Sequence, residues 1–228
     1  MLSGLLATGS SVTLNLGGGL NKPSTSILVL LAVTVLAVAP SMLILLTGFT
    51  RIVIVFGLTR NALGLSSTPP NQVIAGLALF LSLFIMAPTL NQMNEVALQP
   101  YMHGQMSATQ AYRAAEVPLK KWLLEGTGPD ELAVTTSIDK EHPKAPADAS
   151  MAALIPAFLL SQLKSAFTIG FVIFIPFLII DLVVSATLMS MGVVMLPPTL
   201  VSLPFKLLLF VLVNGWVLIT HALVVSFP

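Results

Sequence analysis

Residues 168–216 contain two strongly apolar runs that flank a short break with one glycine and two prolines. Each run carries a single charged residue at a matched position: Asp181 lies 12 residues before Val193, and Lys206 lies 12 residues after Val194. If two helical arms pair antiparallel around this break, the charges meet about 18 Å from the turn, at a rise of about 1.5 Å per residue. The pattern therefore predicts a helical hairpin with an ion pair between its arms.

The chain as a whole is also apolar. Its 228 residues are 56% hydrophobic and 8% charged, with a mean hydropathy of +0.96, whereas about one quarter of a soluble domain is charged. This composition indicates a membrane protein, or at least one that is made through a membrane. The apolar stretches of helical length described below predict an all-α fold. The absence of cysteine excludes disulfides and thiol catalysis, and a net charge of +1 without a basic stripe does not indicate a nucleic-acid partner.

Composition divides the chain into four regions. They are an N-terminal segment (1–25), an apolar helical hairpin region (26–90), a polar segment (91–150) and a C-terminal apolar hairpin (151–228). The polar segment holds eight of the nine acidic and five of the ten basic residues, so we expect it to be the water-exposed part. Within it, Tyr112, Ala115, Leu119 and Trp122 recur at helical spacing in a helix over 108–124. Glycines and prolines predict a mobile loop over 125–150.

The first apolar region begins with a helix of membrane length, Ser26–Leu46, because about 20 apolar residues span a bilayer core. Lys22 and the small residues at 37–39 also fit a signal peptide that is cleaved after Ala39. Both interpretations remain open on the sequence alone.

Prolines set the expected ends of the other apolar stretches. A stretch that starts at Thr47 is ended by Pro69-Pro70, and a helix over Asn71–Met86 is closed by Pro88. Prolines 156 and 176 predict kinks in the apolar run that starts at residue 151.

Five charged residues lie inside apolar stretches: Arg51, Arg60, Lys164, Asp181 and Lys206. Each costs at least a few kcal/mol at mid-membrane, so each should face protein or water and find a partner. We expect them to be buried structural charges. Arg51 and Arg60 are nine residues apart, about 900° around a helix, and should make separate contacts on opposite faces. Asp181 could titrate in an ion or proton relay, or it could fix the helix register as a structural pair; a single acid favours the structural pair.

Met189, Met191 and Met195 lie beside the break. Ordinary core packing is one interpretation, because the chain contains ten methionines. The alternative is a flexible seal, since thioether side chains deform easily and irregular backbone at membrane depth lines a cavity or is buried in protein.

No motif in the sequence indicates catalysis. His103, His142 and His221 are isolated and lack the spacing of metal ligands, and no phosphate-binding glycine loop, nucleophile elbow or paired carboxylates are present. We therefore expect no enzyme activity, no cofactor and no metal site.

Several long motifs resemble a known family. They are PSMLILLTGFTRIVIVF (40–56), RNALG (60–64), PPNQ (69–72), FIPFLIIDLVV (174–184), MSMG (189–192) and LPFKLLLFVLV (203–213). Together they resemble the FliP family, flagellar type III secretion export-gate proteins related to the injectisome SctR family. The similarity extends over residues 26–220.

The resemblance implies a core subunit of the flagellar export gate in the bacterial inner (cell) membrane, at the flagellar basal body. A homopentamer would join FliQ, FliR and FlhB in a helical pore complex, in contact with membrane lipid, that secretes unfolded flagellar proteins. The segment 91–150 would be periplasmic. Residues 189–198, here called the gate loop, would close the pore with Met189, Met191, Val193, Val194 and Met195. The alternatives are an ion-coupled small-molecule transporter, in which Asp181 titrates, and a structural assembly scaffold.

Two positions depart from the family pattern. Val193 and Val194 stand where members often have consecutive methionines, so the seal would mix valine with methionine. Asn214 stands where members commonly have an acid.

Overall fold

The computed structural model describes residues 25–139, 143–193 and 195–227, and every regular element among them is helical. The chain divides into two compact units, 1–40 and 41–228. The first helix, α1 (Thr25–Leu46), crosses this boundary and is unbroken through Ala39 and Pro40. Its bounds agree with the predicted helix Ser26–Leu46.

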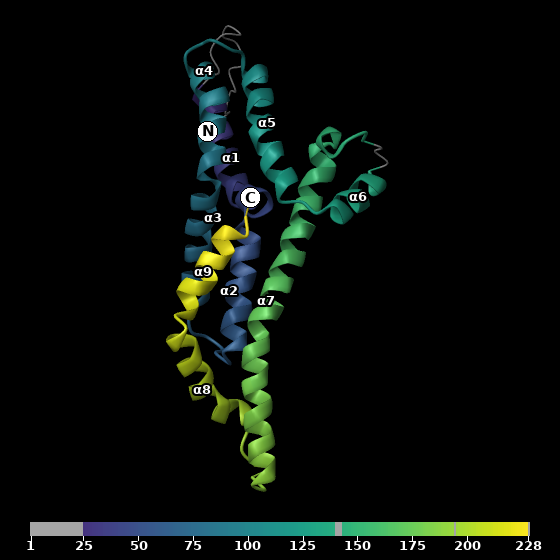
Figure 1. Ribbon diagram of the computed structural model, residues 1–228. Helices are drawn as coiled ribbons and strands as arrows, with labels where there is room; N and C mark the ends of the chain where they lie inside the picture. Colours follow the sequence, from purple (N-terminus) through teal and green to yellow (C-terminus); the bar gives the residue numbers. More distant parts are fainter. Residues whose placement is uncertain (1–24, 140–142, 194, 228) are drawn as a thin grey trace, which may run out of the picture. The chain divides into compact units, whose positions relative to one another are not determined.

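Helix α2 (Phe49–Ala62) is the centre of the second unit. It packs against α3 (Asn71–Met93) and α7 (Met151–Ser190), and Figure 1 shows it between them with α9 (Gly215–Val225) alongside. Its inward face is fully buried through Ile52, Val55, Phe56 and Thr59. The ring of Phe56 meets Trp216 of α9 edge to face, with centroids 6.0 Å apart. One apolar face of α2 therefore organises three neighbouring helices.

Helix α2 ends earlier than predicted. It stops at Ala62 because Gly64, with φ +79°, closes it: Gly64 N donates to Asn61 O and Leu65 N donates to Arg60 O. This left-handed glycine cap ends the helix several residues before Pro69-Pro70.

The prediction that Pro88 closes the next helix is wrong. Helix α3 runs through Pro88 and continues through a π-helical turn (η1, Asn94–Leu98) into α4 (Gln99–Met102), which makes 32 continuous residues. A proline removes one backbone hydrogen bond, and here packing offsets that loss, because α5 (Ala108–Glu125) lies against both α3 and η1.

The polar segment is more ordered than predicted. Helix α5 starts with a capping box in which Ser107 and Gln110 bond reciprocally. Its expected apolar face is partly wrong, because Trp122 is buried but Tyr112 is 71% exposed. The predicted mobile loop over 125–150 contains helix α6 (Pro129–Ile138) and a short 3-10 helix, η2 (Pro146–Asp148).

Helix α6 forms for local and tertiary reasons. Proline occupies its first position, two acidic residues lie in its first turn, and Leu132, Thr135 and Thr136 are buried. Contacts with α7 complete its packing. Glycines and prolines in this stretch therefore mark helix ends.

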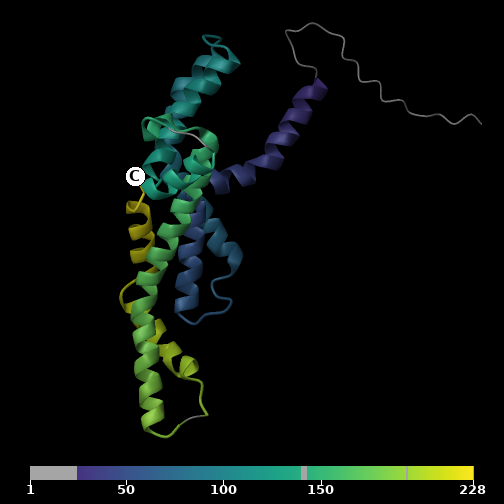
Figure 2. The ribbon, with the colours of Figure 1, turned by 90° about the vertical axis from the view of Figure 1, so that its right-hand side faces the viewer.

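The C-terminal region forms the predicted hairpin. Helix α7 is capped by Ser150 and continues through Pro156 and Pro176 for 40 residues. Helix α8 (Pro198–Leu212) returns along it, and Figure 2 shows the two arms joined by the gate loop. The apolar run after the gate loop forms two helices: α8 and α9 meet at 61°, and Asn214 between them has a left-handed φ of 52°.

Two helical stretches are long and apolar enough to cross a membrane, Asn71–Met102 and Met151–Ser190. Two bent pairs of helices, Leu36–Leu46 with α2 and α8 with α9, are also long and apolar enough to cross a membrane if each pair counts as one span. Between two and four spans are therefore compatible with the described helices.

Candidate functional site

Asp181 and Lys206 meet between the arms of the hairpin. Lys206 Nζ lies 2.6 Å from Asp181 Oδ2 and donates a second hydrogen bond of 3.2 Å to the carbonyl oxygen of Ala62. Ser202 Oγ donates to Asp181 Oδ1 at 2.5 Å. The Lys206 side chain is only 5% exposed and that of Asp181 28%. The two charges are in contact across the hairpin, as its register predicts.

The ion pair also ties the hairpin to a third helix. Ala62 is the last residue of α2, where carbonyl groups lack partners within the helix. A cation at this end also interacts favourably with the helix dipole. Lys206 therefore bonds to α2 and α7 at once, so the hairpin is held at a defined height along the central helix.

Ser202 is a site residue that the sequence reasoning missed. It lies four residues before Lys206 on α8 and is fully buried. Residues four apart share a helix face, so this spacing was a usable signal. With Ser202 and Lys206 bound, both carboxylate oxygens of Asp181 have a partner.

The gate loop extends from the far end of this hairpin. Gly192, with φ +73°, ends α7 through bonds from Gly192 N to Met189 O and from Val193 N to Leu188 O. Met189, Met191 and Met195 are 71%, 70% and 96% exposed. Val193 is half-buried, and Val194 lies outside the described residues. The loop thus presents three thioether side chains away from the core.

The two arginines of α2 have different partners, as their spacing predicts. Arg51 is buried; its Nη1 donates to the backbone oxygen and the hydroxyl of Ser226, and its guanidinium lies 4.0 Å from the ring centroid of Phe227. Arg60 Nη1 donates to Pro69 O at 3.1 Å and to Asn71 Oδ1 at 2.6 Å. Arg51 therefore fixes the C-terminal segment, and Arg60 fixes the connection between α2 and α3.

Lys164 was predicted to be a buried charge, and this prediction is wrong. Its side chain is 63% exposed and extends from α7 toward α6. There its Nζ lies 2.8 Å from Glu131 Oε1 and 3.8 Å from Asp130 Oδ2. The hydrogen bond from Lys164 lowers the pKa of Glu131 below its ordinary value of 4.5. Lys164 therefore binds the polar segment to the hairpin. It does not belong to the cluster of Asp181, Ser202 and Lys206, here called the Asp181 cluster.

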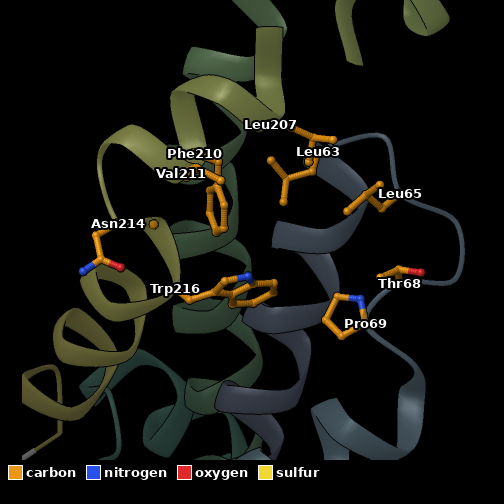
Figure 3. A pocket seen from close by; sticks show the side chains of 10 residues that line it. Leu63, Leu65, Thr68, Pro69, Leu207, Phe210, Val211, Asn214 and Trp216 are labelled. Carbon is orange, nitrogen blue, oxygen red and sulfur yellow. The ribbon is translucent and has the colours of Figure 1, made fainter. Parts of the chain in front are cut away.

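A pocket of about 380 Å³ lies beside the Asp181 cluster, between the end of α2 and the bend from α8 to α9. Figure 3 shows Phe210 facing Leu63 and Leu65 across this pocket, with Trp216 below them. The rings of Phe210 and Trp216 meet edge to face, with centroids 5.3 Å apart. The lining is mainly apolar. It comes from the connection between α2 and α3 and from the bend between α8 and α9.

Among the described residues, no group of three His, Cys, Asp or Glu side chains could hold a metal ion. His103 Nδ1 contacts Gln99 O of its own turn at 2.7 Å, and His142 lies outside the described residues. The hairpin with its ion pair and the gate loop are therefore the candidate functional features.

The family model that matches this chain is that of the FliP family, over residues 32–223. This range contains the hairpin, the ion pair, the gate loop and both arginines of α2. The chain belongs to the FliP family. The motifs at 40–56 and 174–213 therefore identified the family correctly.

Curated relatives agree with this assignment over more than four fifths of their length. The flagellar biosynthetic protein FliP of Bacillus subtilis (strain 168) is 52% identical over 205 residues, which cover 90% of this chain and 93% of the relative. That of Caulobacter vibrioides is 45% identical and covers 96% of this chain and 82% of the relative. That of Aquifex aeolicus is 46% identical, with 89% and 86% covered.

Proposed function

We propose that this chain is a core subunit of the flagellar type III protein export gate. Five copies would form a pore together with FliQ and FliR, in association with FlhB, through which unfolded flagellar proteins cross the bacterial inner membrane at the basal body. Family membership supports the flagellar role, and two to four membrane-length apolar stretches support the location. The chain would supply a passage and no catalytic activity.

The observation that carries the proposal is the buried ion pair that holds the hairpin. Lys206 binds both Asp181 and the end of α2, so the hairpin arms have a fixed register near the core. The gate loop beyond them exposes three methionines. Such apolar exposure is costly in water for an isolated chain and indicates a further surface to contact.

A ring of chains would give the gate loops that contact. Copies around one axis bring identical loops together, and flexible thioether side chains can close an opening of varying shape. An apolar constriction of this kind excludes ions by excluding water. Val193 and Val194 would add β-branched apolar side chains to the same seal.

The direct test is small-ion leak through the assembled complex. Replacing Met191 and Met195 together with alanine should raise the leak in membrane vesicles without preventing assembly. Met102 is 74% exposed but lies on α4, outside the gate loop, so Met102→Ala is the matched control. An unchanged leak in the double variant would assign the seal to other residues.

Two further experiments separate the alternative functions. If the chain were an ion-coupled transporter, Asp181→Asn would stop transport even in a normally assembled complex. The structure favours a structural role, because both oxygens of Asp181 already have partners. If the chain were only an assembly scaffold, a photo-crosslinker at position 191 or 195 would not reach a stalled export substrate.

A further inference from the structure

The gate loop concentrates exposed sulfur. Met189, Met191 and Met195 are at least 70% exposed, whereas Met86 in the core is 4% exposed. Apart from its own chain neighbours, no heavy atom of the described residues lies within 4 Å of the point where a Cβ on Gly192 would stand, so the turn beside these side chains is open. A small solute can therefore reach these thioethers in the described chain.

These sulfurs have no competing thiol in their own chain. The sequence contains no cysteine, so methionine is its only oxidisable sulfur. Oxidation converts an apolar, flexible thioether into a polar sulfoxide, which disrupts surfaces built from methionine. Susceptibility follows exposure, which places the gate loop well ahead of the core methionine.

We propose that Met189, Met191 and Met195 form an oxidation site through which a peroxide opens the gate. The inference rests on the proposed function of the gate loop as a seal. Three adjacent sulfoxides would place polar oxygens where the closed constriction needs an apolar lining, so water and ions would enter.

The chemistry is a two-electron oxygen transfer. The sulfur lone pair attacks one peroxide oxygen, the O–O bond breaks as the S–O bond forms, and proton transfer releases the other oxygen as water. Sulfur is oxidised and the peroxide is reduced. A methionine sulfoxide reductase reverses the change: a dithiol supplies two electrons and two protons, becomes a disulfide, and the oxygen leaves as water.

The test uses membrane vesicles from cells that make the full chain with the rest of its flagellar export apparatus. Vesicles are treated with hydrogen peroxide, and peptide mass spectrometry locates each sulfoxide by its added mass of about 16 Da. Ion leak is measured before and after treatment, and the ratio is taken within each variant, so that a changed basal seal does not enter the comparison.

We expect oxidation at the three loop methionines and at the exposed Met102, but not at Met86. The leak should rise severalfold in the native chain and in Met102→Leu. It should not rise in a variant with leucine at positions 189, 191 and 195. Treating the oxidised native vesicles with methionine sulfoxide reductase and a dithiol should restore the seal, a readout that needs no variant.

The inference is overturned if the loop methionines stay reduced, if their sulfoxides leave the leak unchanged, or if peroxide raises the leak of the leucine variant by the same ratio as that of the native chain. These results are separate from failure of the proposed function. That failure would appear without oxidant, as an unchanged leak when Met191 and Met195 are replaced by alanine.

Discussion

Replacing Lys206 with methionine tests the central ion pair most directly. The substitution keeps an unbranched side chain of similar length but leaves the Asp181 carboxylate with only the hydroxyl of Ser202. Removing one partner of a buried pair costs about 3–5 kcal/mol. Because the Asp181 side chain is 28% exposed and keeps one hydrogen bond, we expect a loss near the lower end, about 3 kcal/mol.

Exchanging the charges refines this expectation. Asp181→Lys combined with Lys206→Asp restores the attraction between the two side chains. It also places a carboxylate beside the carbonyl oxygen of Ala62, which accepts a hydrogen bond from Lys206 in the native chain. Loss of that charge-assisted bond costs about 1.5–3 kcal/mol. The exchanged variant should therefore be more stable than either single charge reversal and less stable than the native chain.

The measurements are the thermal unfolding of the purified complex, the yield of assembled complex on native gels, and swimming motility. Lys121→Met is the control, because the Lys121 side chain is 69% exposed and its change should stay within about 0.5 kcal/mol. If the exchanged variant is no better than the single reversals, the hairpin is not held by this pair.

Three more predictions follow from the surrounding contacts. Arg51→Lys loses the planar donor over the ring of Phe227 and should lower stability by about 1–2 kcal/mol, seen as a lower melting temperature. Gly64→Ala forces a side chain into the left-handed region and should cost about 1–2 kcal/mol in the same assay. The lowered pKa of Glu131 stabilises α6 above pH 4.5, and this contribution is lost as the pH falls through the pKa of the folded state. Glu131→Gln should remove this acid dependence from the protection factors of α6, which are hydrogen-exchange rates divided by the intrinsic rates at the same pH.

Matched variants make these predictions sharper. Arg113→Lys on the exposed face of α5 should leave stability unchanged, and Gly57→Ala, in the middle of α2 with open space around it, should raise stability by up to about 1 kcal/mol. A Gly64→Ala variant as stable as the native chain would mean that Gly64 does not act through its backbone conformation. Protection factors in native α6 that stay constant between pH 7 and 3, after the intrinsic pH dependence of amide exchange is removed, would contradict the role of the Glu131 carboxylate.

Hydropathy and spacing along the chain determined the class of the protein, the hairpin and the partners within it. Long apolar runs with few charges require helices, because a helix satisfies its own backbone hydrogen bonds. The equal distances of Asp181 and Lys206 from the break then fix their encounter, since two straight arms have the same rise per residue. The separation of Arg51 and Arg60 by half a turn followed from the same geometry.

Where helices end was less predictable. Pro88 was expected to end a helix and does not, whereas Gly64 ends α2 before the expected Pro69-Pro70 and Asn214 bends the last apolar run. A proline costs about 3 kcal/mol in a helix interior, and burial against a neighbouring helix offsets a loss of that size. The choice depends on which helices pack together, and a local pattern does not contain that information.

By itself, the sequence determined that the chain is helical and membrane-compatible, that Asp181 faces Lys206, and which family it belongs to. Only the tertiary structure decided that Lys206 also binds the end of α2 and that Lys164 is exposed and binds Glu131. The physical reason is that charge pairs within one hairpin follow from a local period. Contacts with a helix outside that hairpin, such as Lys206 with Ala62 and Lys164 with Glu131, follow from how whole helices pack.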